Sequence, residues 1–84
     1  MSVLPPARVV MIGKPGCHLC DEARAVIERV VAATGDDFAE VDLHADPSFD
    51  RYVEEIPVTF VDGVQHDYWR VDEARLTAAL KASR

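Results

Sequence analysis

A pair of cysteines, Cys17 and Cys20, stands where a buried strand gives way to a helix, and this limits the possible folds more than any other feature. Residues 9–12 are apolar without alternation, which is typical of a strand covered on both faces. Residues 13–16 form a turn that contains two glycines and a proline. Residues 17–33 then carry apolar side chains at helical spacing. The pattern predicts an α/β fold with the cysteine pair at its first strand-to-helix junction.

The middle of the chain predicts a second strand and a short helix. Gly35 is placed to end the first helix, because glycine readily takes the left-handed backbone conformation. Residues 39–43 alternate between apolar and acidic, which indicates a peripheral strand with one wet face. Asp46 can cap a short helix that Pro47 begins and that reaches about residue 54.

The last third predicts a hairpin and a final helix. Residues 58–61 and 64–69 are strand-like and flank Asp62 and Gly63, a dipeptide that favours a tight turn. Asp72 can cap a last helix whose leucines face the core. The order is therefore β-α-β-α-β-β-α. A strand-helix-strand opening implies a parallel pair, so the hairpin completes a four-stranded mixed sheet.

Size and charge exclude several classes of protein. At 84 residues the chain is a single domain, 1–84, because a second core could not bury enough apolar surface. The net charge of -6, with scattered cations, argues against nucleic acid as a partner. Residues 1–6 lack the features of a secretory signal, and no apolar run is long enough to span a membrane. We expect a soluble, monomeric, cytoplasmic protein.

The spacing of Cys17 and Cys20 suits redox chemistry. Residues three apart on one helical turn face the same way, so a disulfide can open and close with little backbone movement. Cys17 stands at the helix N-terminus, where the macrodipole favours a thiolate and makes it the better nucleophile. Cys20, one turn deeper, would resolve the mixed disulfide that Cys17 forms.

A structural zinc site is the alternative interpretation of such a pair. It requires two more ligands at matching spacing, and the chain has no second cysteine pair. His18, His44 and His66 are dispersed, and His44 and His66 are expected at the surface. A cysteine pair that follows a strand and opens a helix favours the redox interpretation.

On these residues the sequence resembles the thioredoxin superfamily, and most closely the glutaredoxin-like branch of short bacterial proteins. The resemblance extends from residue 8 to about residue 80 and implies a thioredoxin-like fold. It implies that Lys14, three positions before the first cysteine, favours the thiolate. It also implies a cis proline at Pro57, after Ile56, which faces the dithiol at the start of the third strand.

The departures from the family pattern point away from its best-known members. Met11 stands where thioredoxins carry a buried acid. Where glutaredoxins have a Gly-Gly pair for glutathione, this chain has Tyr68 and Trp69, and of the glutathione-binding pattern only Asp72 remains. In an alternating strand, one of these two aromatic side chains should face the core and the other solvent. His18 replaces the usual proline between the cysteines and can stabilise a neighbouring thiolate.

The sequence thus predicts a thiol-disulfide oxidoreductase that needs no cofactor and reduces disulfide-bearing proteins. Cys17 is the nucleophile, Cys20 resolves, and Pro57 shapes the approach of substrate. Ile56, Lys14 and Asp72 are further substrate-binding candidates. Glutathione or a flavin-dependent reductase would supply electrons. Two alternatives stay open: an iron-sulfur cluster shared between two chains through Cys17 and glutathione, or a redox-inactive docking domain.

Overall fold

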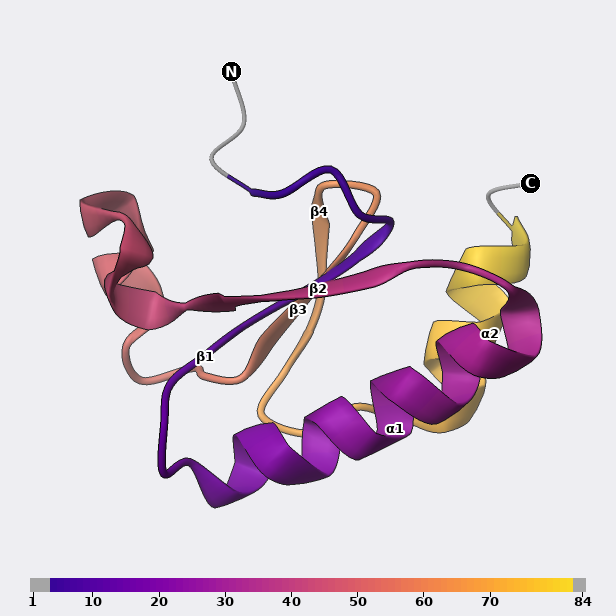
Figure 1. Ribbon diagram of the computed structural model, residues 1–84, viewed down its shortest axis with the longest axis horizontal. Coiled ribbons are helices and arrows are strands. Elements are labelled where there is room, and N and C mark those ends of the chain that lie inside the picture. Colours follow the sequence, from indigo (N-terminus) through magenta and orange to yellow (C-terminus); the bar gives the residue numbers. More distant parts are fainter. Residues whose placement is uncertain (1–3, 83–84) are drawn as a thin grey trace.

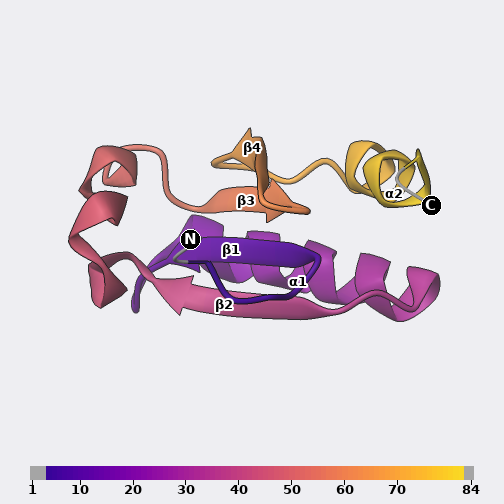
Figure 2. The ribbon, with the colours of Figure 1, turned by 90° about the horizontal axis from the view of Figure 1, so that it is seen from above.

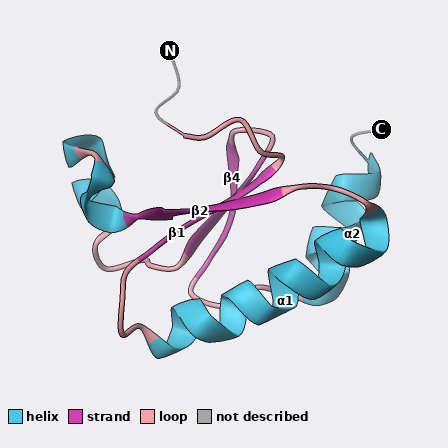
Figure 3. Cartoon of the chain, viewed as in Figure 1, coloured by secondary structure: helices cyan, strands magenta, loops and turns pink. Residues whose placement is uncertain are grey.

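The computed structural model describes residues 4–82, which form a four-stranded mixed sheet with helical elements on both faces (Figures 1 and 3). The strand order is β2-β1-β3-β4: β1 is parallel to β2 and antiparallel to β3, and β3 and β4 form the hairpin. This is the predicted thioredoxin-like α/β fold. The elements are β1 (Val9–Gly13), α1 (His18–Thr34), β2 (Phe38–Asp42), the 3-10 helices η1 (Leu43–Ala45) and η2 (Pro47–Tyr52), β3 (Val58–Val61), β4 (Val64–Tyr68) and α2 (Glu73–Ala82).

The first β-α-β unit forms as the sequence predicts. Cys17 is the N-cap of α1, because its side chain accepts a hydrogen bond from the amide of Cys20. Gly35 ends the helix with φ +80°, and its amide donates to the carbonyl of Val31 over 2.8 Å. The chain then returns to pair β2 with β1 in parallel, which leaves the cysteines beyond the C-terminal end of β1.

The two faces of the sheet carry separate halves of the core. Alternate residues of β1 point to opposite faces, so a strand without polar positions is buried on both sides. The face under α1 and α2 contains Val9, Met11, Cys20, Ala23, Ile27, Val30, Val61, Leu76 and Leu80. The opposite face, toward the 3-10 helices, contains Val10, Ile12, Leu43, Phe49, Ile56, Val58 and Phe60.

The segment after β2 differs from the prediction in two respects. The strand ends at Asp42, and buried Leu43 begins η1 rather than continuing the alternation. The helix capped by Asp46 is a 3-10 helix that ends at Tyr52, two residues earlier than expected. Both aspartate side chains accept a hydrogen bond from the amide two residues later, at 2.7 and 2.8 Å, which favours such tight turns.

The final helix begins where its cap was predicted. The Oδ1 atom of Asp72 accepts a hydrogen bond from the amide of Arg75 over 2.9 Å. The helix α2 lies beside α1 (Figure 1), and Arg29 Nη2 is 3.0 Å from Glu73 Oε1 across that contact. Figure 2 shows the same packing from above. Among residues 4–82, no helix is both long and apolar enough to cross a membrane.

One arginine joins four parts of the chain at the start of β1. The guanidinium of Arg8 donates to Asp36 in the turn before β2 and to Asp62 in the hairpin turn, at 2.8 and 2.9 Å. It also reaches the carbonyl of Leu80 in α2 at 3.4 Å. Its backbone amide donates to Asp37 over 2.7 Å. These contacts tie the sheet to α2 at the end remote from the cysteines.

Candidate active site

The two cysteines lie at disulfide distance and differ in exposure. Their Cα atoms are 5.1 Å apart, and the amide of Cys20 donates a hydrogen bond to Cys17 Sγ over 3.2 Å. Cys17 is partly exposed at the N-terminus of α1, whereas Cys20 is fully buried in the core under that helix. An external thiol or disulfide can therefore reach Cys17 more readily than Cys20.

Gly13, the last residue of β1, provides the space that the sulfur of Cys20 occupies. A Cβ atom at this position would lie 2.9 Å from Cys20 Sγ, closer than real Cβ contacts allow. This role was not predicted from the sequence, which indicated only a turn glycine. The signal was a glycine at the end of an otherwise bulky buried strand, a place where another group often approaches the backbone closely.

Pro57 lies next to this contact. The Ile56–Pro57 peptide bond is cis, as predicted, and Pro57 is fully buried. The register pairs Ile12 with Val58, so its continuation by one residue sets Pro57 beside Gly13. The face of the sheet can be identified as well, because Val61 packs under α1 and alternation places Pro57 on that same face. Pro57 therefore borders the side of the sheet on which Cys20 is buried.

A groove of about 470 Å³, here called the aromatic groove, runs from the cysteine motif to the end of β4. Leu19, between the two cysteines, and Ile56, before the cis proline, form one part of its lining. The predicted split of the aromatic pair is wrong: Tyr68 is 48% exposed and Trp69 is 50% exposed. The reason is that β4 ends at Tyr68, so strand alternation no longer applies. The full lining is Leu19, Ile56, Asp67, Tyr68, Trp69 and Arg70.

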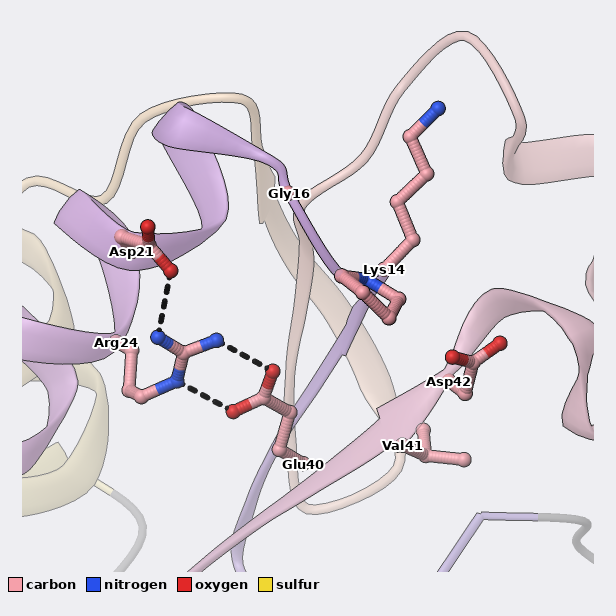
Figure 4. Close-up of a pocket in the computed structure, with 9 residues that line it drawn as sticks. Lys14, Gly16, Asp21, Arg24, Glu40, Val41 and Asp42 are labelled. Atoms are coloured by element: carbon pink, nitrogen blue, oxygen red, sulfur yellow. Dashed lines mark hydrogen bonds and ion pairs between the residues drawn. The ribbon is translucent and has the colours of Figure 1, made fainter.

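A second hollow of about 410 Å³, here called the polar hollow, lies on the β2 side of the motif (Figure 4). In it Arg24 donates to both carboxylate oxygens of Glu40, at 2.6 and 2.7 Å, and to Asp21 at 2.8 Å. These two carboxylates raise the pKa of Arg24 above its usual value, Glu40 more than Asp21. Lys14 lines this hollow but is exposed, and its ammonium points away from the ion-paired group.

The remaining predicted site residues are not gathered into either hollow. His18 is exposed as the first residue of α1. Asp72 is exposed, and its carboxylate caps α2 rather than lining the aromatic groove. The structure therefore brings Ile56 and Pro57 to the motif, with Lys14 on its other side and Asp72 beyond the groove.

One histidine differs from expectation. His66 on β4 is only partly exposed, and its buried Nε2 atom has no hydrogen-bond partner among residues 4–82. Burial lowers the pKa of His66, nearby Arg75 lowers it further, and Asp67 opposes them. His44 is exposed as predicted. Within the described part of the chain, no three His, Cys, Asp or Glu side chains cluster in a way that could hold a metal ion.

Comparison with known proteins agrees with this architecture. A family model described as "Glutaredoxin-like domain (DUF836)" matches residues 8–81. Uncharacterized protein Rv0508 of Mycobacterium tuberculosis is 27% identical over 82 residues, which cover 90% of this chain and 84% of that protein.

Two solved structures are similar over nearly their whole length. The X-ray structure of protein XcR50 from X. campestris has a TM-score of 0.71 at 26% identity, with 90% of this chain and 99% of that chain covered. The solution NMR structure of protein Ne2328 from Nitrosomonas europaea has a TM-score of 0.75 at 22% identity, with 94% and 96% covered. Both share the fold described above.

Proposed function

This chain belongs to the glutaredoxin-like domain family, whose model matches residues 8–81, and on that premise we propose that it is a thiol-disulfide oxidoreductase that reduces protein or mixed disulfides. One observation carries the proposal: a cysteine pair at disulfide distance whose first member is accessible at a helix N-terminus and whose second is buried. This asymmetry suits a nucleophile and a resolving thiol.

The reaction transfers two electrons from the dithiol to the substrate disulfide. The thiolate of Cys17 attacks one substrate sulfur, the substrate S–S bond breaks, and the other substrate sulfur leaves with the electron pair and takes up a proton. Cys20 then loses its proton and attacks Cys17 Sγ. The second substrate thiol leaves, and the Cys17–Cys20 disulfide forms. Substrate is reduced and the enzyme is oxidised.

Several groups of the chain support the proposed steps. The unpaired amides and dipole of the α1 N-terminus favour the thiolate of Cys17. Lys14, three residues before it, and His18, immediately after it, add positive charge when protonated. Pro57 and Ile56 flank the approach of substrate, and Asp72 is the candidate partner for the ammonium group of glutathione.

Recycling of the enzyme requires an external electron donor. Glutathione or a flavin-dependent reductase would reduce the Cys17–Cys20 disulfide and return two electrons. Such a cycle needs a reducing compartment, so the proposal places the protein in the cytoplasm and assigns it no resident cofactor. A monomer suffices, because both sulfurs come from one chain.

Single cysteine variants test the mechanism. Cys17→Ser should abolish reduction of a peptide disulfide, whereas Cys20→Ser should retain the first attack and accumulate a mixed disulfide that mass spectrometry detects. His44→Gln, which changes an exposed residue outside both hollows, serves as the control and should behave as wild type. Equal activity of the two cysteine variants would reject the mechanism.

The alternatives leave different signatures in the same preparation. A brown protein with absorbance in the cluster band, lost in Cys17→Ser, would identify an iron-sulfur module. A protein that forms its disulfide normally but reduces no substrate would indicate a docking domain. The proposed function predicts a colourless protein that reduces disulfide substrates catalytically.

A further inference from the structure

The aromatic groove begins at a residue of the cysteine motif and at the residue before the cis proline. Leu19 lies between the two cysteines in sequence, and Ile56 directly precedes Pro57; both line the groove. A substrate chain bonded to Cys17 Sγ would therefore have neighbouring residues close to this groove.

Tyr68 and Trp69, here called the aromatic wall of the groove, are held in place by hydrogen bonds rather than by packing in the core. Trp69 has φ +64°, a left-handed conformation that non-glycine residues rarely adopt and that costs free energy. Its amide donates to the carbonyl of Pro57 at 2.8 Å, and its indole Nε1 donates to the carbonyl of Glu54 at 2.9 Å. The Tyr68 ring meets the indole edge to face, with centroids 5.0 Å apart. Two hydrogen bonds thus anchor a half-exposed apolar surface to the cis-proline segment.

The charge at the groove is unlike that of the whole chain. The protein carries a net charge of -6, yet the groove presents Arg70, an exposed cation. The one carboxylate in the lining, Asp67, is 17% exposed and paired with Arg75 at 3.2 Å. An incoming carboxylate would therefore meet the positive charge of Arg70, while the negative charge of Asp67 is already compensated.

We propose that the aromatic groove is a specificity subsite, which takes a large apolar side chain adjacent to the reactive cysteine of the substrate protein while Arg70 pairs with a nearby acidic residue. This rests on the proposed function and names its substrate class: disulfides whose cysteine is flanked by phenylalanine or leucine and by glutamate. Apolar burial supplies most of the selectivity, and the exposed charge pair adds less because water screens it.

Short peptides whose single cysteine carries a thionitrobenzoate group test the selectivity. The Cys17 thiolate attacks the peptide sulfur, the S–S bond breaks, and coloured thionitrobenzoate leaves with the electron pair. We use the Cys20→Ser variant and measure the second-order rate constant of thionitrobenzoate release. It should be about tenfold higher for a peptide with phenylalanine or leucine beside its cysteine than for a peptide with serine there. Replacing a glutamine of the peptide near its cysteine by glutamate should raise this rate constant about twofold further. The Arg70→Gln variant should lose that twofold gain.

Matched variants localise the effect. Trp69→Ala should reduce the tenfold preference to about twofold or less. Val64→Ala, which shortens a 69% exposed apolar residue of β4 outside the groove, should leave it unchanged. Should Trp69→Ala fail to fold, Tyr68→Ala and the fluorescence measurement below provide independent tests.

Trp69 is the only tryptophan of the chain, so its emission reports on the groove. The mixed disulfide with the phenylalanine peptide should shift that emission to shorter wavelength than the mixed disulfide with the serine peptide, because the indole loses water. Identical spectra together with identical rates would overturn the subsite. Failure of the proposed function is distinguishable, since the Cys20→Ser protein would then release no thionitrobenzoate from any peptide, and the wild-type protein would not reduce the small disulfide bis(2-hydroxyethyl) disulfide to 2-mercaptoethanol.

Discussion

The polar hollow and the aromatic groove, which flank the N-terminus of α1, differ in whether their side chains are paired within the chain or exposed to water. In the polar hollow, Arg24 is shared between Glu40 and Asp21, so these three side chains pair with one another within the chain. In the aromatic groove, Tyr68 and Trp69 leave about half of their surface in water. Covering an apolar surface with a partner stabilises the complex, whereas covering side chains that are already ion-paired adds little. The contrast supports the proposal that the groove is the substrate side of the disulfide.

The largest expected effect concerns Cys17, which in the sequence follows Gly16 of the polar hollow and precedes Leu19 of the aromatic groove. In the reduced protein we expect the pKa of Cys17 to lie below the ordinary thiol value of about 8.5, because the thiol stands at a helix N-terminus. Since Cys17 is also more accessible, we expect it to be alkylated at least about a hundredfold faster than buried Cys20. Iodoacetamide labelling across pH, mapped by mass spectrometry, measures both rates. Preferential labelling of Cys20 would reverse the assigned roles.

The second prediction asks what the aromatic wall excludes. We expect glutathione to bind with a dissociation constant ten- to a hundredfold higher than in a glutaredoxin with the Gly-Gly pair, because Tyr68 and Trp69 remove contacts worth about 1 kcal/mol each. Calorimetry on Cys20→Ser measures the affinity, and turnover of a glutathionylated peptide measures its consequence. Tight binding with rapid turnover would mean that these side chains do not obstruct the ligand.

The third prediction tests the close contact between Gly13 and the sulfur of Cys20. Gly13→Ala should shift the dithiol-disulfide equilibrium about tenfold toward the dithiol, which raises the reduction potential by about 30 mV. The reason is that the Cβ atom of the alanine would meet Cys20 Sγ at 2.9 Å. Equilibration against dithiothreitol measures the shift. Gly35→Ala is the control: it strains a left-handed glycine with open space around it and should lower stability without moving the equilibrium. Equal equilibria in all three proteins would remove Gly13 from the site.

The smallest effect is expected in the polar hollow. Arg24→Ala should lower the free energy of unfolding by less than about 1 kcal/mol, because its ion pairs are partly exposed to solvent, which weakens them. Urea denaturation measures this loss, and the rate of peptide reduction should stay within about twofold of wild type. A large loss of activity would mean that substrate uses this side as well, and the contrast between the hollows would fail.

Local patterns explain why much of the site could be predicted. The uninterrupted apolar run of β1, the helix start at Cys17, the cap at Asp72 and the terminating Gly35 are properties of short segments. Each follows from backbone hydrogen bonding and side-chain spacing within a few residues. The cis bond before Pro57 followed from the resemblance to a family rather than from such a pattern.

Predictions failed where neighbours in space decide the outcome. The exposure of Tyr68 and Trp69 depends on where β4 stops pairing with β3, and the two hydrogen bonds that hold Trp69 come from residues 12 and 15 positions away. The partial burial of His66 likewise depends on elements packed around β4. Strand alternation describes only a continuing strand, so it cannot indicate where pairing ends.

The sequence by itself determined the order of elements and the position of the cysteine pair at a helix start, because periodicity and capping act over a few residues. Only the tertiary structure decided that Cys20 rests on Gly13 and that Leu19, Ile56 and Trp69 line one groove. These residues come from segments far apart in the chain, and they meet because the register of β1, β3 and β4 brings their ends together. Chain packing, rather than any local pattern, therefore sets which side of the cysteine motif carries the aromatic groove.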